Sequence, residues 1–183
     1  MIFSGNALLK RLAMPPRSRE IKELINKGRI VIEPFPKIGR EKIARVASLP
    51  LEIGEIREPE IPSTSKWICI DFSQEETLKE ADRSFRPFKG EKFYLHPGVH
   101  NFARAETKQF LGIPNDLLGE ITVKEEFRKY GLAIIGGVNY VPPRFMGTVT
   151  ADIINSGNRP IVLSVGLPIF EIRFHLLSSP IEP

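Results

Sequence analysis

The segment 119–174 constrains the fold more than any other part of the chain. Apolar and β-branched residues come there in short runs that turn residues separate. The runs that we predict as strands are residues 148–154, 161–165 and 168–174. In the last run apolar side chains alternate with charged ones, which is typical of a strand with one buried face. The segment therefore predicts a mainly β protein whose sheet is buried on one side.

Turn residues divide these runs. The tetrapeptide 155–158, Asn-Ser-Gly-Asn, predicts a tight reversal between the first two strands. Residues 124–129, which precede the runs, are the most densely charged part of this half of the chain. We expect any chemistry to lie where the β segment meets these charged residues.

The N-terminal part of the chain predicts two helices. Residues 4–13 have leucines on one face and basic residues on the other, as an amphipathic helix does. A second helix is expected to begin after Ser18 and to end at Gly28. We therefore divide the chain into an N-terminal helical arm, residues 1–16, and a β domain, residues 17–183.

The middle of the chain is less regular. Residues 37–45 are basic, and their composition favours a solvated loop over a binding patch. Residues 46–53 form an apolar run that Pro50 interrupts, which predicts a strand at the edge of a sheet. Residues 67–72 read as a further strand, and residues 73–89 as a charged surface insertion or a short helix.

Composition excludes several classes of protein. The chain has 183 residues, 42% of them hydrophobic, which is enough for a single core. Its one cysteine, Cys69, excludes an internal disulfide and a multi-cysteine metal site. The net charge is only +4, and no basic run is interleaved with aromatics, so we expect no nucleic-acid partner. No apolar run is long enough to span a membrane, and we expect a soluble cytoplasmic protein.

The order of several short motifs resembles a known superfamily. These are GRIVIEPF at residues 28–35, FYLHPGVHNFARAETKQFLGIPNDLLG at 93–119 and GLPIFEIRF at 166–174. Together they are similar to the dCTP deaminase and dUTPase superfamily, nearer the dCTP deaminase branch, over roughly residues 16–174. The resemblance implies a distorted β-barrel or jelly roll that assembles as a homotrimer, with active sites between subunits.

The resemblance also implies an activity. Members of the superfamily remove an amino group from dCTP, hydrolyse dUTP to dUMP and pyrophosphate, or do both. They hold no zinc, and magnesium comes bound to the triphosphate. We therefore expect no cofactor with protein ligands, and Mg²⁺ only together with a deoxynucleoside triphosphate.

The family motifs are altered at the positions that meet substrate. The first motif places an acidic residue where this chain has Pro50. The second motif, Arg-Ser-Ser-x-x-Arg, matches residues 124–129, where both hydroxyls are carboxylates and both arginines are lysines. In the third motif, residues 140–147, the aspartate is Pro142 and a glycine is Arg144. Because arginine does not easily take a positive φ, we expect a reshaped hairpin.

Residue by residue, the resemblance gives a candidate site. Asp152 falls on the deaminase's general-base glutamate, and Glu171 on a late glutamine. The candidate catalytic residues are Asp152 and Glu126. The candidate nucleotide-binding residues are Lys124, Arg128, Lys129, Asn139, Tyr140 and Thr150.

The substitutions at the second motif have two interpretations. A carboxylate about 4 Å from a phosphate charge costs roughly 4 kcal/mol at an effective dielectric near 20, so Glu125 and Glu126 oppose triphosphate binding. Alternatively, residues 124–129 form a short helix whose charges pair locally. Glu125 with Arg128, and Glu126 with Lys129, have the spacing of such surface ion pairs.

Three hypotheses follow. The first is a homotrimeric dCTP deaminase-like protein that has lost most or all catalysis and keeps a nucleotide-binding or regulatory role. The second is an active, divergent dCTP deaminase or dUTPase, with Asp152 as general base and Lys124 and Lys129 on the phosphates. The third is a structural or partner-binding module that uses the helix at residues 4–13.

Overall fold

The structure, a computed structural model, describes residues 4–13, 21–60, 73, 85–98, 102–137 and 139–181, and these form a mainly β fold. The helices are α1 (Gly5–Arg11), α2 (Ile21–Asn26), α3 (Arg40–Val46) and α5 (Glu125–Arg128). The strands are β1 (Val31–Glu33), β2 (Ser48–Leu51), β3 (Ile53–Pro59), β4 (Phe85–Pro87), β5 (Phe93–Leu95), β6 (Phe102–Thr107), β7 (Phe110–Gly112), β8 (Leu117–Val123), β9 (Leu132–Gly137), β10 (Tyr140–Val141), β11 (Met146–Gly147), β12 (Thr150–Asn155), β13 (Ile161–Leu163) and β14 (Phe170–Leu176). The mainly β class predicted from the sequence is confirmed.

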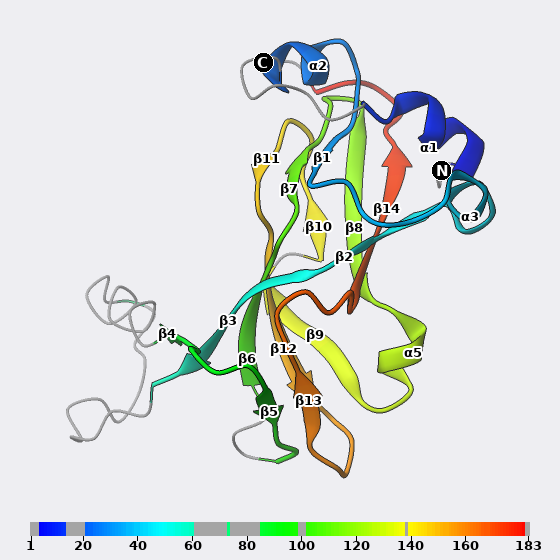
Figure 1. The fold of residues 1–183 in the computed structure, drawn as a ribbon. Coiled ribbons are helices and arrows are strands. Elements are labelled where there is room, and N and C mark those ends of the chain that lie inside the picture. Colours follow the sequence, from blue (N-terminus) through cyan, green and yellow to red (C-terminus); the bar gives the residue numbers. More distant parts are fainter. Residues whose placement is uncertain are drawn as a thin grey trace.

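The strands form antiparallel sheets that pack around one main core, with a small second cluster at Ala13, Ile25 and Val31 (Figure 1). The strand orders are β10-β8-β14-β2, β4-β3-β6-β12-β9, β1-β7-β11 and β13-β5. Among the described residues no sheet closes on itself, which matches the jelly-roll form of the predicted fold rather than a closed barrel. The long strands β8 and β14 run side by side in Figure 1, and β14 lies between β8 and β2.

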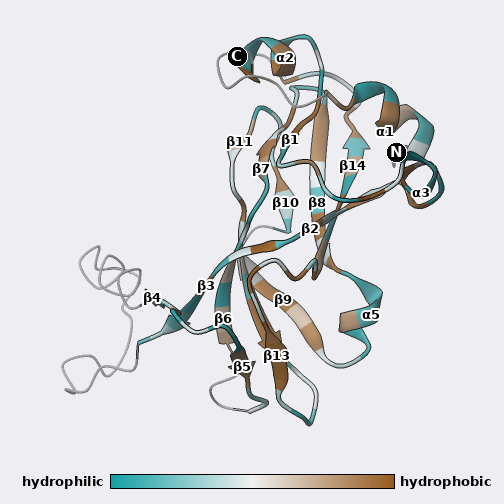
Figure 2. Ribbon diagram, in the orientation of Figure 1, coloured by the Kyte–Doolittle hydropathy of each residue, from teal (hydrophilic) through white to brown (hydrophobic). Residues whose placement is uncertain are grey.

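Strand β14 shows why the sequence folds this way. Its apolar residues Phe170, Ile172 and Phe174 are fully buried, whereas the charged residues between them are half-buried on the other face. Burial of one such side chain stabilises the fold by about 1.5–3 kcal/mol. The alternation predicted from the sequence is confirmed, and the apolar colour of the inner strands is visible in Figure 2.

The N-terminal helices pack on the sheets. Ser4 caps α1 by accepting a hydrogen bond from the backbone N–H of Ala7, and Leu8 is fully buried in the main core. A guanidinium nitrogen of Arg11 lies 2.6 Å from both carboxylate oxygens of Asp116, which ties α1 to the turn before β8. The predicted boundary between residues 16 and 17 lies outside the described residues.

Two predictions in the middle of the chain are decided by the structure. Residues 37–45 were expected to be a solvated loop, and this is wrong, because α3 forms there with Ile43 fully buried. Tertiary packing of one apolar residue against α1 overrides the weak local signal. The edge position expected for the strand with Pro50 is confirmed, since β2 is the outer strand of its sheet.

The reversal at residues 155–158 does not join two paired strands, as had been expected. The chain does turn there, but β12 pairs with β6 and β9, whereas β13 pairs with β5. The two flanking strands therefore do not form a hairpin with each other. The strand predicted at residues 67–72, with Cys69, lies outside the described residues. None of the helices described is long and apolar enough to cross a membrane.

Candidate functional site

A cavity of about 770 Å³ opens beside β2, β14 and α5, and we call it the motif cavity. Three of the segments that resemble family motifs converge on it: residues 48–52, residues 124–128 and Glu171. The segment 36–46, which contains α3, forms the remaining wall with Pro168 and Arg173. The cavity therefore lies at the place that the sequence indicated, where the β segment meets the charged residues after β8.

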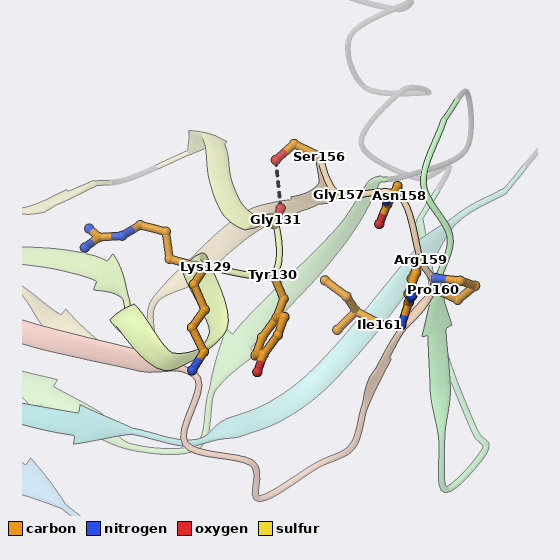
Figure 3. Close-up of a pocket in the computed structure, with 10 residues that line it drawn as sticks. Lys129, Tyr130, Gly131, Ser156, Gly157, Asn158, Arg159, Pro160 and Ile161 are labelled. Atoms are coloured by element: carbon orange, nitrogen blue, oxygen red, sulfur yellow. Dashed lines mark hydrogen bonds between the residues drawn. The ribbon is translucent and has the colours of Figure 1, made fainter.

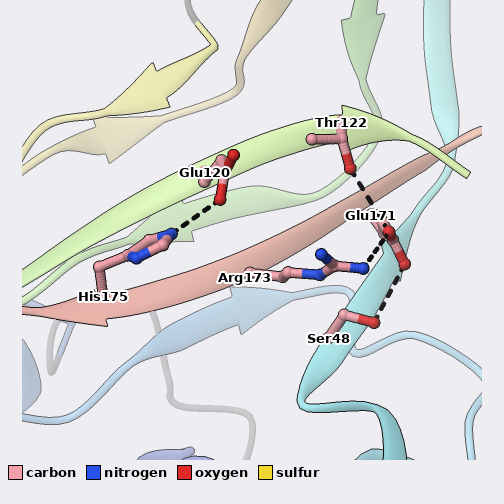
Figure 4. Close-up of polar contacts among 6 residues, drawn as sticks. All are labelled: Ser48, Glu120, Thr122, Glu171, Arg173 and His175. Atoms are coloured by element: carbon pink, nitrogen blue, oxygen red, sulfur yellow. Dashed lines mark hydrogen bonds and ion pairs between the residues drawn. The ribbon is translucent and has the colours of Figure 1, made fainter. Parts of the chain in front are cut away.

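In the wall of the motif cavity, the Glu171 carboxylate accepts hydrogen bonds from three neighbouring side chains (Figure 4). The Ser48 hydroxyl donates to one carboxylate oxygen over 3.1 Å. The other oxygen accepts from Arg173 at 2.9 Å and from the Thr122 hydroxyl at 3.4 Å. The Glu171 side chain is only 20% exposed. Its carboxylate is thus neutralised and held by groups of its own sheet.

The charged residues before and in α5 also pair among themselves. The second motif does form a short helix, but Glu126 pairs with Lys124 rather than with Lys129. The hydrogen bond and the positive charge of Lys124 lower the pKa of Glu126 below its ordinary value. The Lys124 ammonium also lies 5.6 Å from the ring centroid of Phe127. Lys124 therefore has a carboxylate partner before any ligand arrives.

Asp152, the candidate general base, lies on β12 and does not line the motif cavity. It faces Arg104 across the sheet, and the Arg104 Nε atom is 2.9 Å from its carboxylate. The side chains of Asp152 and Arg104 are 14% and 27% exposed. The Arg104 guanidinium is 4.1 Å from the ring centroid of Phe85, which fixes it from the other side. The carboxylate is therefore held in a half-buried ion pair.

The other candidate residues lie in two further places. Thr150 begins β12 opposite Glu106, and Tyr140 lies on β10 with Asn139 immediately before it. Lys129 lines a different cavity, described below. Within one chain the structure thus brings only some of the candidates together, namely Lys124, Glu126 and Arg128. No cluster of His, Cys, Asp and Glu suited to a metal ion occurs in the described part of the chain.

The third motif contains a tight turn at residues 142–145. The Phe145 backbone N–H donates to the Pro142 carbonyl at 3.2 Å, and Arg144 has a φ of 63°. With Pro143 at the second position, this is the geometry of a type II turn, in which glycine is favoured at the third position. Arg144 thus adopts the left-handed conformation that was expected to be difficult for arginine, whereas the reshaped hairpin stays a prediction.

Sequence reasoning missed the partners of Asp152 and Glu171 on neighbouring strands. Arg104 and Ser48 reach these carboxylates across strands, so their pairing depends on strand register, whereas Arg173 lies two residues from Glu171 on the same face of β14. The one signal for Arg104 was its place in the AR-x-E motif of residues 103–106. Nothing in the sequence indicated that it faces Asp152.

The antiparallel sheets and the charged cavity define a jelly-roll-like protein with a site suited to a charged ligand. A family model described as dCTP deaminase-like matches residues 17–177, and the chain therefore belongs to the dCTP deaminase-like family.

Known proteins of this family resemble the chain over most of its length. A dCTP deaminase, dUMP-forming, of Methanobrevibacter smithii is 28% identical over 164 residues, which cover 90% of this chain and 81% of that protein. The enzyme of the same description from Nocardia farcinica is 29% identical over 164 residues, covering 90% and 77%. The 2'-deoxycytidine 5'-triphosphate deaminase of Agrobacterium tumefaciens has a similar fold, with a TM-score of 0.58 and 14% identity over 96% of this chain and 46% of that one.

Proposed function

We propose that this protein is a homotrimer that binds a deoxynucleoside triphosphate but has lost most or all of the family's catalysis. The proposal is supported by the contacts of three acidic residues that stand at altered motif positions. Each forms an ion pair with a cation of its own chain: Asp152 with Arg104, Glu126 with Lys124, and Glu171 with Arg173.

These ion pairs oppose deamination. A general base must approach the attacking water and accept its proton, and small displacements of the base cost rate steeply. Asp152 is one methylene shorter than the family's glutamate, and the bond to Arg104 holds its carboxylate against the sheet. Glu126 stands where the family has a hydroxyl, and its lowered pKa keeps it ionised. It cannot donate a hydrogen bond as that hydroxyl would.

The motif cavity still suits an anionic ligand. Lys37, Lys42 and Arg128 line it, and none of them forms an ion pair within the part of the chain that the structure describes. Its volume is within the range of small-molecule sites. A triphosphate would bring its own Mg²⁺, which would reduce the repulsion from Glu125 and Glu126. We therefore expect weak to moderate nucleotide affinity rather than none.

Trimer formation would account for the separation of the candidate residues. Asp152, Thr150, Asn139 and Tyr140 lie away from the motif cavity of their own chain. The family's active sites lie between subunits, so we propose that these residues face the motif cavity of a neighbouring subunit. The mass of the assembly, measured by light scattering, tests this part directly, and a stable monomer would contradict it.

The second candidate function is an active dCTP deaminase or dUTPase. The relatives described as dCTP deaminase, dUMP-forming, favour it, because they match 90% of this chain. In this case Asp152 would leave Arg104 and act as the base, while Lys124 and Lys129 would contact the phosphates.

Nucleotide titration followed by product analysis separates these two functions. The protein is titrated calorimetrically with dCTP and with dUTP in the presence of Mg²⁺, and the nucleotide is then recovered and chromatographed. We expect saturable binding, weakened by Lys42→Gln, with the nucleotide recovered unchanged. The matched control is Lys89→Gln, since Lys89 is exposed and does not line the motif cavity. Recovery of dUTP, dUMP or pyrophosphate would favour the active enzyme, and no binding at millimolar nucleotide would contradict the proposal.

A further inference from the structure

A second cavity, of about 890 Å³, lies between two turns of the chain (Figure 3). Residues 128–131, at the end of α5 and just after it, form one wall, and residues 156–161, from the end of β12 to the start of β13, form the other. Among the described lining residues, only Arg128 lines both this cavity and the motif cavity. We call this second cavity the turn cavity.

The two turns are locked together by their backbones. The Ser156 backbone N–H and hydroxyl both donate to the Gly131 carbonyl, at 2.8 and 2.9 Å, and Figure 3 shows the hydroxyl contact. A Cβ atom added to Gly131 would lie 2.3 Å from the Gly157 nitrogen, and Gly131 has a φ of 96°. Neither turn can move without breaking this contact. The turn cavity therefore has its shape before any ligand binds.

The turn cavity is strongly cationic. Arg128, Lys129 and Arg159 line it, and none of the described residues that line it is acidic. In the described ranges none of these three cations forms an ion pair, in contrast to Lys124, Arg104 and Arg173 elsewhere on the surface. Three cations without an ion-pair partner around one cavity attract an anion with more than one charge.

An aromatic ring is part of the same wall. Tyr130 is 65% exposed, and the Lys129 ammonium lies 5.0 Å from its ring centroid. Pro160 and Ile161 add apolar surface on the opposite side. An exposed tyrosine beside cations is a platform on which a flat ring can stack while its phosphates contact the basic side chains.

We propose that the turn cavity is a second ligand site, which binds a phosphorylated molecule with a flat ring, of the nucleoside diphosphate class. The phosphates contact Arg159, Lys129 and Arg128, and the ring stacks on Tyr130. Of the residues that form this site, Lys129, Tyr130 and Arg159 do not line the motif cavity, and Arg128 lies between the two cavities.

Three probes separate the contributions of charge and ring. They are cytidine 5′-diphosphate, inorganic pyrophosphate and cytidine, each titrated by calorimetry. We expect the diphosphate to bind more tightly than either of the other two, and raised salt to weaken the diphosphate and pyrophosphate. Arg159→Gln should weaken both anions roughly tenfold, as loss of one charge-assisted contact does. Tyr130→Leu should weaken the diphosphate about tenfold and leave pyrophosphate affinity unchanged, whereas Tyr130→Phe should change neither.

Variants of the motif cavity provide the control. Lys42 and Lys124 line only that cavity, so glutamine at either position should leave the effects of Arg159→Gln and Tyr130→Leu in place. The proposal is overturned if neither anion binds at millimolar concentration. It is also overturned if Lys42→Gln abolishes all binding while Arg159→Gln and Tyr130→Leu have no effect. Because Arg159 and Tyr130 are exposed, all variants should melt within a few degrees of the parent protein.

Discussion

The ion pair between Arg104 and Asp152 can be measured as a coupling free energy. The two residues are direct partners in the β6–β12 register, and Arg104 is additionally packed against Phe85. Replacing Arg104 by methionine leaves a shorter unbranched side chain and removes both the charge and the guanidinium that lies over the Phe85 ring. Replacing Asp152 by asparagine keeps the shape of that side chain. The two variants and their combination therefore form a double-mutant cycle that isolates the pair.

The structure sets the expected size of this coupling. Opposite charges about 4 Å apart attract by roughly 4 kcal/mol at an effective dielectric of 20, before desolvation is subtracted. Fully exposed pairs contribute about 0.2–1 kcal/mol, and breaking a buried pair costs about 3–5 kcal/mol. Asp152 and Arg104 are 14% and 27% exposed, which places them between these cases. We expect a coupling free energy of about 1–2 kcal/mol.

Urea unfolding of the four proteins at one protein concentration gives the coupling, because stability of an oligomer depends on concentration. A coupling free energy below about 0.3 kcal/mol, the limit of additivity, would refute the idea that Asp152 is engaged with Arg104. In that case the carboxylate would be available as a base.

Three further predictions test other parts of the structure. Lys124→Gln should raise the pKa of Glu126 toward its ordinary value in an NMR titration. In the parent protein the lowered pKa stabilises the fold above the ordinary carboxyl pKa and the effect is lost on acidification, so an unchanged pKa in the variant would contradict the pairing. Arg144→Gly should raise the free energy of unfolding by about 0.5–1 kcal/mol by relieving the positive φ, and a loss of stability in thermal unfolding would contradict this. Asn155→Ala should cost about 2–4 kcal/mol, because one buried and one part-buried carbonyl group lose their donor, whereas Asn158→Ala, at an exposed position, should cost less than about 0.5 kcal/mol.

The sequence was sufficient for the class of fold because the relevant signals are local. Alternation in β14 and the interrupting Pro50 in β2 both report which face or edge of a strand is covered. The helix α3 was missed because its buried apolar residue Ile43 stands among charged residues. Its stability comes from packing against α1, which no local pattern contains.

The site was predicted less completely, since its properties depend on contacts between distant residues. Asp152 and Arg104 are 48 positions apart and meet only through strand register. The turn cavity was not anticipated because it forms between the turn after α5 and the turn after β12. The three-residue spacing on α5 predicted that Glu126 pairs with Lys129. Glu126 pairs instead with Lys124, which lies before the helix at the N-cap position.

The rate of ammonia release from dCTP is the most direct test of lost catalysis. The protein and its Asp152→Asn variant are incubated with dCTP and Mg²⁺ at micromolar protein over several hours, and ammonia is measured by an enzyme-coupled assay. We expect both proteins to give the same trace as a sample without protein. Steady release by the parent protein that Asp152→Asn abolishes would show that Asp152 acts as a base and would contradict the proposed function.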